Sequence, residues 1–594
     1  MDLNTYTPET LLRKYKSLRR ELFAQETQWL DKRIAILGGS TTTDIRKMLE
    51  LYLLSYGIRA KFYESEYGQY WQDAMFKTPE LTEFQPDIIF IHTSNRNITS
   101  FPQVGDTKET VNALLQEEYA HFSAMWEKLS VDYCCPIIQN NFEYPYWRLL
   151  GNADAVLEQG KVHFLTCLNL MFAEYAQAHP NFYLNDLNWL SANYGLEAWS
   201  DPFYWHMYKY ALALPAIPRL AQSVANIIKS IYGKNKKAFA LDLDNTLWGG
   251  VVGDDGPENI QIGQETSVGQ MYAEFQQYLK AHQQIGVILN IISKNEEENA
   301  LAGLQNPGNI LKPEDFISIK ANWEPKNENL RTMASELSLL PESFVFIDDN
   351  PAEREIIRQT FPQGAIPELQ TPEHYIHAID REGYFEVTSL TKDDLARGEM
   401  YRENAARVRQ QASFTDYNEY LRSLEMKAEI RSFQPVYYER IAQLTNKSNQ
   451  FNLTTLRCTQ EEIKHFAEEN SYITLYGKLQ DKFGDNGVVS VIMGERQGTD
   501  LHIRLWLMSC RVLKRGMEFA MMKELVRTAC QMKITRVYGY YYPTAKNAMV
   551  KEFYQMQGFT KQQEDKQGNT VWTLEIPSEY QPKDLQIQIN EEKE

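Results

Sequence analysis

Short apolar runs alternate with longer amphipathic stretches along the first two thirds of the chain, a pattern that predicts strands separated by helices. The strand-sized runs lie at 33–37, 87–92, 136–138, 238–241, 287–292, 316–319 and 344–347. Strands that alternate with helices form parallel sheets, and ligands bind such sheets at the carboxyl ends of the strands. We therefore expect α/β domains whose functional residues follow the apolar runs.

Changes in this pattern divide the chain into five parts. We expect an α/β domain at 1–225, a second at 226–385, a connecting region at 386–425, an α+β domain at 426–585 and an acidic tail at 586–594. The connecting region is charged and poor in apolar residues, which predicts a solvated helix. The tail is expected to be frayed.

Composition and charge narrow the class of protein. Of 594 residues, 43% are apolar and 24% are charged, as in a folded globular protein. The formal net charge of −18 disfavours binding to nucleic acid or to an anionic membrane surface, since both require a basic surface. The start of the chain shows no signal peptide, and no two of the six cysteines are spaced Cys-x-x-Cys. We expect a cytoplasmic protein without a cysteine zinc site.

The residues that most clearly indicate a chemical function directly follow the strand predicted at 238–241. Asp242 and Asp244 lie two positions apart directly after it, so alternation places them on the same side of an extended chain. Two neighbouring carboxylates repel each other unless a cation such as Mg²⁺ joins them. Asp242 can then attack a phosphorus atom, and Asp244 can protonate the leaving oxygen and later deprotonate water.

Three later strand ends supply the remaining groups. Ser293 can hold a phosphoryl oxygen, Lys326 can neutralise developing charge, and Asp348 and Asp349 offer further metal ligands. Neither interval between Asp242, Ser293 and Lys326 is long enough for a sizeable lid domain. This favours an extended substrate, or closure of the site by the flanking domains.

These segments resemble the haloacid dehalogenase superfamily, in the order D-x-D-x-T, Ser, Lys and an acidic pair. The resemblance implies a Rossmann-like domain with a minimal cap. It implies that Asp242 is the nucleophile, Asp244 the acid and base, and Thr246 a determinant of loop geometry. Ser293 and Lys326 would hold phosphate. The implied Mg²⁺ ligands are Asp242, Asp244, Asp348 and Asp349.

The third domain contains a candidate pyrophosphate cradle. A strand predicted at 501–508 leads through a turn into a helix, and backbone N–H groups at a helix start bind anions. The turn resembles the Gln/Arg-x-x-Gly-x-Gly/Ala loop of Gcn5-related N-acetyltransferases, except that Lys514 replaces the first glycine. The resemblance implies binding of acetyl-CoA or another acyl donor, with Tyr554 as an acid. The implied binding residues are Arg511, Lys514, Arg515, Gly516 and Asn547.

The order of the domains resembles the FkbH-like proteins over essentially the whole chain. The matching phrases are 242–256 (DLDNTLWGGVVGDDG), 445–455 (TNKSNQFNLTT), 483–487 (FGDNG) and 509–513 (SCRVL). Members of that family transfer a glyceryl group from 1,3-bisphosphoglycerate to a carrier-protein thiol with loss of phosphate, and others are associated with surface-sugar biosynthesis. Cys510 lies beside Arg511 before a predicted helix and is a candidate acyl relay, with a plain buried cysteine as the alternative.

The first domain is the least informative. Residues 38–40 (GGS), Gly68, Asn141 and the pair Asp201 and His206 resemble the SGNH-hydrolase pattern, although the pair is spaced more widely than in that family. Seven of the eleven tryptophans lie before residue 210, and aromatic faces suit sugar rings or a partner surface. We expect a degenerate doubly wound hydrolase fold used for recognition, for example of carbohydrate.

The sequence thus predicts a Mg²⁺-dependent phosphatase or phosphotransferase coupled to acyl transfer, in polysaccharide or secondary-metabolite biosynthesis. Its partner would be a phosphorylated small molecule or a sugar phosphate. One alternative is glyceryl transfer to an acyl carrier protein. A second is a non-catalytic scaffold in a biosynthetic complex.

Overall fold

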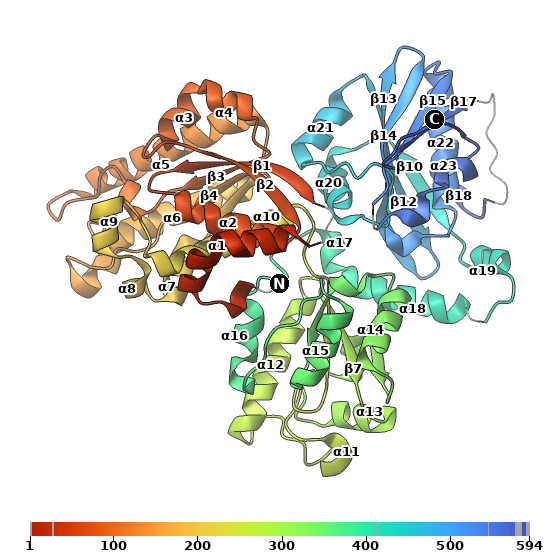
Figure 1. The fold of residues 1–594 in the computed structure, drawn as a ribbon, viewed down its shortest axis with the longest axis horizontal. Helices are drawn as coiled ribbons and strands as arrows, with labels where there is room; N and C mark the ends of the chain where they lie inside the picture. The colour runs from red at the N-terminus through yellow and green to blue at the C-terminus, as the bar shows by residue number, and fades with distance from the viewer. Residues whose placement is uncertain (1–2, 26–28, 412, 545, 577–584, 590–594) are drawn as a thin grey trace. The chain divides into compact units, whose positions relative to one another are not determined.

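The computed structural model describes residues 3–25, 29–411, 413–544, 546–576 and 585–589 (Figure 1). The chain forms two compact units. The first consists of residues 1–232 with 459–462, and the second of residues 233–458 with 463–594. The two sheets that follow residue 233 therefore lie within one unit. Among the described residues, no helix is both long enough and apolar enough to cross a membrane.

The first unit is built on a parallel five-stranded sheet of order β2-β1-β3-β4-β5. Its strands are β1 (Leu30–Gly38), β2 (Ile58–Glu64), β3 (Ile88–His92), β4 (Ile137–Asn140) and β5 (Phe182–Asn185). Ile34 and Ile36 of β1 belong to one apolar core, and Ala35 and Leu37 to another. Because successive side chains point to opposite faces, both faces of this sheet are buried, which explains the unbroken apolar run.

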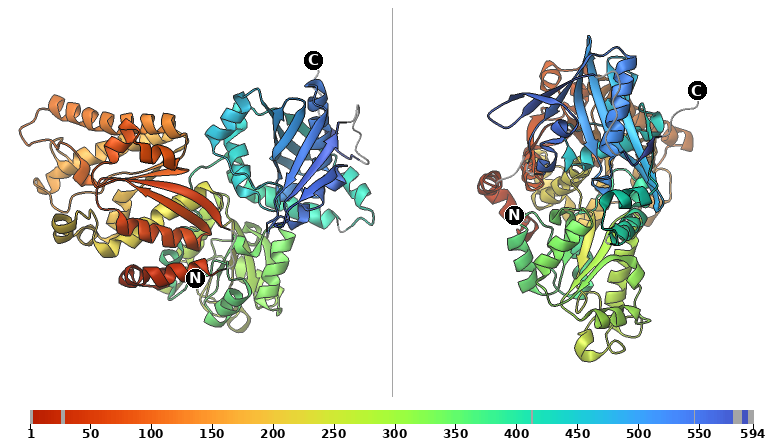
Figure 2. Two further views of the ribbon diagram at one scale, coloured as in Figure 1. Left: turned by 45° about the horizontal axis from the view of Figure 1, so that its top comes forward. Right: turned by 90° about the vertical axis from the view of Figure 1, so that its right-hand side faces the viewer.

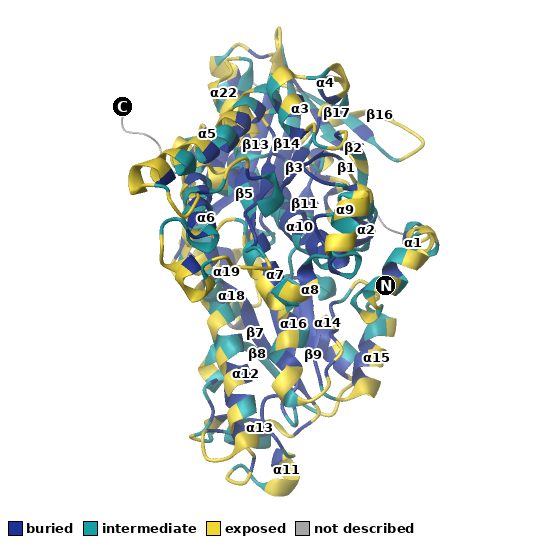
Figure 3. Ribbon diagram, turned by 90° about the vertical axis from the view of Figure 1, so that its left-hand side faces the viewer, coloured by how far each residue is buried: buried dark blue, intermediate teal, exposed yellow. Residues whose placement is uncertain are grey.

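Helices from separate parts of the first unit fill these two cores. The core that contains Ile34 is completed by α1 (Pro8–Phe23), α2 (Thr43–Ser55) and α10 (Ile217–Ile231). The opposite core is completed by α3 (Tyr70–Phe76), α5 (Lys108–Tyr133) and α6 (Lys161–Ala178). The burial colouring shows β3, all of whose residues are buried, inside this unit (Figure 3). The predicted doubly wound α/β architecture is confirmed for this part of the chain.

The second unit begins with a parallel four-stranded sheet of order β8-β7-β6-β9. Its strands are β6 (Ala238–Leu241), β7 (Ile288–Ser293), β8 (Phe316–Ala321) and β9 (Phe344–Ile347). The helices that pack on it include α12 (Ser267–Gln283), α13 (Glu297–Gln305), α14 (Lys326–Glu336) and α15 (Pro351–Thr360). Since β6 pairs with both β7 and β9, the polar residues that follow these three strands meet at one edge of the sheet.

The connecting region is helical, as predicted, but it is not solvated on all sides. It contains α17 (Lys392–Leu395), α18 (Arg397–Gln411) and α19 (Tyr417–Ser423). One face of α18 is buried, and it consists of Met400, Tyr401, Asn404 and Arg407. These residues recur at helical spacing, but two of them are polar, so the buried face does not stand out as an apolar stripe. The expectation of a fully solvated helix is wrong for this face.

The C-terminal part of the second unit forms a nine-stranded mixed sheet (Figure 2). Its order is β16-β17-β15-β14-β13-β12-β10-β18, and β11 pairs with β14. The strands are β10 (Lys427–Arg431), β11 (Phe451–Asn452), β12 (Tyr472–Asp481), β13 (Gly484–Gln497), β14 (Asp500–Met508), β15 (Arg536–Tyr541), β16 (Thr560–Glu564), β17 (Thr570–Glu575) and β18 (Gln588–Ile589). With α20 (Tyr438–Lys447) and α22 (Met517–Gln531), this is the predicted α+β class.

Part of the predicted tail belongs to this sheet. Residues 588–589 form β18 and pair in parallel with Lys427 and Ala428 of β10. Ile587 is buried in the C-terminal core. The expectation of a frayed segment is therefore wrong for residues 587–589, and residues 590–594 lie outside the described part of the chain.

Candidate active site

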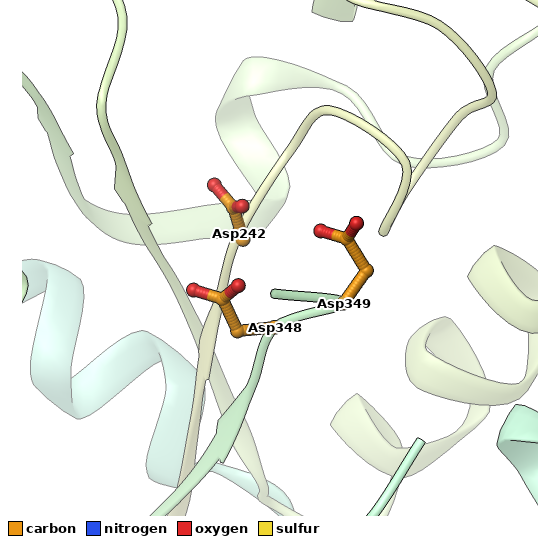
Figure 4. A group of neighbouring side chains, drawn as sticks. All are labelled: Asp242, Asp348 and Asp349. Atoms are coloured by element: carbon orange, nitrogen blue, oxygen red, sulfur yellow. The ribbon is translucent and has the colours of Figure 1, made fainter. Parts of the chain in front are cut away.

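Three acidic side chains gather at the carboxyl ends of β6 and β9 (Figure 4). One carboxylate oxygen each from Asp242, Asp348 and Asp349 lies within 4.8 Å of the others. Burial, followed by repulsion from Asp242, raises the pKa of Asp348 to about 7, and the same two causes raise the pKa of Asp349. Clustered carboxylate oxygens are the ligands that Mg²⁺ prefers, so these residues fit that ion.

Lys326 opposes this negative charge from the first position of α14. Its Nζ atom lies 2.9 Å from Asp242 and 2.6 Å from Asp348. Burial disfavours its charged form, but the two carboxylates raise its pKa above the ordinary lysine value. The lysine therefore carries a positive charge at the point where the sequence placed the group that neutralises phosphate. Ser293 is buried at the end of β7, the neighbouring strand.

Asp244 does not join the three clustered carboxylates. Its Oδ1 atom accepts hydrogen bonds from the Trp248 indole at 2.9 Å and from the Val252 N–H at 3.0 Å. Its Oδ2 atom accepts from the Asn295 amide at 3.1 Å. The expectation that the Asp244 side chain is a metal ligand is thus not supported by its position. Burial raises its pKa, which suits a group that gives and takes a proton.

A turn after β6 brings residues of the following loop to the Asp244 carboxylate. Asn245 has a positive φ of 54°, and its side chain accepts a hydrogen bond from the Gly250 N–H at 3.0 Å. This conformation turns the chain directly after Asp244, so that Trp248 and Val252 come within hydrogen-bonding distance of its carboxylate. Thr246 accepts a hydrogen bond from the Asp349 N–H at 3.2 Å. It therefore ties the two loops together, in keeping with its predicted geometric role.

Three residues that the sequence did not single out support this site. Arg354 of α15 is buried, and its Nη1 atom donates to the carbonyl oxygens of Asp348 and Asp349, both at 2.8 Å. Trp248 and Asn295 hold Asp244, as described above. An arginine on an amphipathic helix resembles a surface residue, and no signal in the sequence marks Arg354. Trp248 and Asn295 follow predicted site residues closely and could have been considered for that reason.

The C-terminal loop keeps a glycine-type conformation without its first glycine. Lys514 has a positive φ of 63°, and Gly516 has a φ of 85° directly before α22. The Lys514 carbonyl accepts a hydrogen bond from Tyr417 at 2.8 Å. Replacement of the expected glycine by Lys514 thus leaves the left-handed backbone in place. A Cβ atom on Gly516 would meet no atom within 4 Å, so conformation rather than crowding accounts for this glycine.

Two of the predicted cofactor-binding side chains are held inside the protein. Arg515 is buried, with an ion pair to Asp481 at 3.2 Å and a hydrogen bond to Asn404 at 2.8 Å. Asn547 is fully buried and donates to the carbonyl oxygens of Asn452 at 2.9 Å and Tyr542 at 3.0 Å. Both side chains act as internal ties in this structure. The expectation that they face a cofactor is not supported by their positions.

Tyr554 and Cys510, two other predicted functional residues of the C-terminal domain, differ in how far they are exposed to solvent. Tyr554 is fully buried, burial raises its pKa, and its ring contacts Gly539 closely enough that a Cβ atom there would clash. A phenol in this position is not exposed for proton donation. Cys510 is partly exposed and begins a short helical turn, and Arg511 follows it.

β11 covers part of the edge of β14 that β15 leaves unpaired. β14 pairs with β15 only through Asp500–His502, and the strands separate beyond that point. β11 pairs with Met508 and Leu507 of β14, and the Leu453 N–H donates to the Trp506 carbonyl at 3.1 Å. The FkbH-like phrase at 445–455 therefore places backbone in this gap. A ligand could not form strand-like hydrogen bonds with the same groups.

In the first unit, the residues of the SGNH-like pattern do not form a catalytic triad. Ser40 is buried after β1, and no described residue forms a hydrogen bond with its hydroxyl. Asp201 accepts from the Phe203 N–H at 2.8 Å as a helix cap, and His206 is exposed on α9 (Pro202–Tyr208). Asn141 donates to Asp186 at 2.8 Å. Gly68 has a positive φ of 73° in a turn.

Known proteins match separate parts of the chain. A model of the FkbH N-terminal domain matches residues 33–229. None of the curated proteins matches the chain. One solved structure is the N-terminal part of a Bacteroides fragilis protein, which contains a phosphatase domain and is complexed with Mg. It is 30% identical with a TM-score of 0.58, and the match covers 63% of this chain and 99% of that one.

Two acetyltransferases match a smaller part of the chain. The ribosomal-protein-S18-alanine N-acetyltransferase of Escherichia coli is 10% identical with a TM-score of 0.21, and the match covers 26% of this chain and 97% of that one. An N-acetyltransferase of Thermoplasma acidophilum in complex with coenzyme A is 14% identical with a TM-score of 0.19, covering 25% and 99%. Likeness at this level carries no conclusion about activity. The almost complete cover of the Bacteroides structure at 30% identity, together with the FkbH domain match, shows that the chain belongs to the FkbH-like family.

Proposed function

We propose that this protein is a Mg²⁺-dependent phosphatase or phosphotransferase that works through an aspartyl-phosphate on Asp242 and is coupled to acyl transfer by its C-terminal domain. The observation that carries the proposal is the convergence of Asp242, Asp348 and Asp349 around the buried ammonium of Lys326. The substrate class would be a small phosphorylated molecule or a sugar phosphate in polysaccharide or secondary-metabolite biosynthesis. The Bacteroides relative, with its phosphatase domain and Mg, supports this reading.

The residues of the site divide the reaction into two steps. In the first, an oxygen of Asp242 attacks phosphorus, the bond to the leaving oxygen breaks, and Asp244 gives that oxygen a proton. In the second, Asp244 takes a proton from water, which attacks the same phosphorus and frees phosphate from Asp242. Ser293 and Lys326 orient and neutralise the phosphoryl oxygens. When bound to Asp242, Asp348 and Asp349, Mg²⁺ would supply further neutralisation of phosphoryl charge.

The test is phosphate release from a panel of sugar phosphates and phosphoglycerates, with and without Mg²⁺. Asp242→Asn keeps the shape of the side chain but removes the attacking charge, so the rate should fall by at least about a thousandfold. Asp254→Asn is a matched control, because Asp254 is an exposed aspartate of the short helix α11 (Val252–Asp255). Retention of the parent rate by Asp242→Asn would remove this residue from the nucleophile role.

A second candidate function is glyceryl transfer to a carrier-protein thiol, which the partly exposed Cys510 beside Arg511 favours. The Cys510 sulfur would attack the acyl carbon of an acyl phosphate, phosphate would leave, and a thioester would form. The carrier thiol would then attack that thioester and release Cys510. A stoichiometric mass increase on the intact protein that vanishes in Cys510→Ala would support this function. Acyl transfer without the adduct would favour direct transfer from acetyl-CoA or another donor.

A further inference from the structure

Near Cys510, the second unit has more basic side chains than neighbouring carboxylates. The basic side chains are contributed by the residue before β6, by α18, by α20 and by the short helical turn after β14. They are Lys237, Arg397, Arg440, Lys447 and Arg511. We call this group the junction cluster. It stands out because the chain as a whole has a net charge of −18.

Two carboxylates of α17 balance only part of this charge. Arg440 lies 2.7 Å from Asp393. Lys447 lies 3.0 Å from Asp394, and Arg397 also pairs with Asp394. The contacts of the Arg511 guanidinium are with neutral groups, namely the sulfur of Met400 and the hydroxyl of Ser509. The positive charges of Arg511 and Lys237 therefore exceed what Asp393 and Asp394 can neutralise.

Burial makes the unbalanced positive charge energetically unfavourable. The Arg440 side chain is only 12% exposed and Asp394 only 5%. Burial, followed by repulsion from Arg397, lowers the pKa of Lys447 to about 8 even though Asp394 opposes the change. Burial also lowers the pKa of Arg440 to about 10. An anion with two negative charges in this place would relieve both the repulsion and part of the desolvation cost.

The cluster includes the residue that directly follows Cys510. That residue, Arg511, contacts Met400 of α18, one helical turn along from Arg397. Guanidinium groups bind phosphate oxygens in pairs, and lysine adds a point charge. A thiol next to positive side chains suits a ligand that carries both a phosphate and an acyl or thiol group.

We propose that the junction cluster binds a phosphate monoester dianion and holds it next to Cys510. This inference rests on the acyl-transfer half of the proposed function and names the chemical class that this half would recognise. The same dianion occurs in a phosphorylated acyl donor, such as a phosphoglycerate, and in the 3′-phosphate of coenzyme A. The catalytic carboxylates at the ends of β6 and β9 are not part of the cluster.

Calorimetry on the full chain in the presence of a chelator tests the site. Inorganic phosphate is the probe, and titrations of 3-phosphoglycerate and coenzyme A separate the two sources, with glycerate and dephospho-coenzyme A as matched ligands that lack the monoester. Lys447→Gln and the charge-balanced Arg440→Gln/Asp393→Asn should raise the dissociation constant for phosphate at least tenfold, whereas Lys523→Gln, at an exposed lysine of α22, should not change it. Parent affinity in both cluster variants would overturn the proposal.

Failure of this site and failure of the phosphatase proposal give different results. If phosphate binds at the catalytic strand ends instead, Ser293→Ala should weaken its affinity and Lys447→Gln should leave that affinity unchanged. This result would contradict the junction site. Loss of Mg²⁺-dependent phosphate release in Asp242→Asn is measured separately and does not depend on the cluster.

Peptide-resolved alkylation supplies a measurement that does not rely on a variant. Iodoacetamide should modify Cys510 several times more slowly when phosphate replaces chloride at equal ionic strength, because the bound anion covers the thiol. Cys134, which is exposed in the first unit, is the internal control. Equal rates at Cys510 with saturating phosphate would show that the anion binds elsewhere and would also overturn the proposal.

Discussion

Lys326 donates a hydrogen bond of 2.6 Å to Asp348, and both side chains are almost completely buried. The lysine thus serves the fold as well as the chemistry, because it offsets carboxylates that would otherwise repel each other at the ends of two adjacent strands. Removal of one member of such a pair leaves an uncompensated buried charge.

Lys326→Met should therefore lower both activity and stability. We expect phosphate release to fall by at least about a hundredfold and metal-free unfolding to become easier by about 3–5 kcal/mol. Urea unfolding in chelator and steady-state kinetics measure the two effects. Lys320→Gln is the matched control, since Lys320 pairs with Glu336 nearer the surface at 2.7 Å and should change stability by less than about 1 kcal/mol. An unchanged unfolding midpoint for Lys326→Met would contradict the structural role.

Trp248→Phe should alter the pH dependence of catalysis. The variant keeps an aromatic ring but loses the N–H that donates to Asp244 at 2.9 Å. That N–H favours the ionised carboxylate, so its loss should raise the pKa of Asp244 and move the corresponding limb of the pH–rate profile to higher pH. We expect a fall in rate of about tenfold. Trp323→Phe, at an exposed indole, is the control, and a profile superimposable on the parent would count against the assignment of Asp244.

Arg354→Met should weaken metal binding without touching a ligand. Arg354 holds the carbonyl oxygens of Asp348 and Asp349, so its loss frees the loop that aims both carboxylates. Loss of such supporting contacts typically costs about tenfold to a hundredfold in metal affinity. The Mg²⁺ dependence of phosphate release measures this. Arg358→Gln, on an exposed turn of the same helix, should leave the dependence unchanged.

Glu143 should make the first unit less stable at alkaline pH. Burial raises its pKa to about 8, so the folded state keeps a proton that the unfolded chain releases near pH 4.5. Stability from this group is present at low pH and is lost as the pH rises from about 4.5 to about 8. Hydrogen exchange of residues 137–145 across this range measures the effect. Glu143→Gln should remove the slope, and Glu127→Gln, at an exposed position of α5, should retain it.

Asp481→Asn should destabilise the second unit. Asp481 lies between Arg407 at 2.8 Å and Arg515 at 3.2 Å and joins α18 to the C-terminal sheet. Loss of its charge leaves two buried guanidinium groups, at a cost of about 3–5 kcal/mol in urea unfolding. Asp485→Asn, at an exposed carboxylate 4.0 Å from Lys478, should cost less than about 1 kcal/mol. Equal effects of the two substitutions would mean that the buried ion pairs do not hold these elements together.

The sequence by itself determined the α/β rhythm and the strand ends that carry chemistry. Strands buried on both faces require unbroken apolar runs, and parallel strands bring their carboxyl ends to one edge, so Asp242, Ser293 and Asp348 were predicted together. Local order was sufficient for this because each residue ends its strand or directly follows it. The turn that leads through Gly516 into a helix was predicted from its place after a strand and from its resemblance to the acetyltransferase loop.

Only the tertiary structure decided where side chains beyond those strand ends point. The chain turns at Asn245, and hydrogen bonds from Trp248 and Asn295 hold the Asp244 side chain apart from the clustered carboxylates. Arg515 is directed inward because Asp481, distant in the sequence, lies within reach of its guanidinium. The junction cluster unites residues from four separate elements. A sequence pattern records periodicity and neighbours along the chain, whereas burial and ion pairing depend on which distant segments pack together.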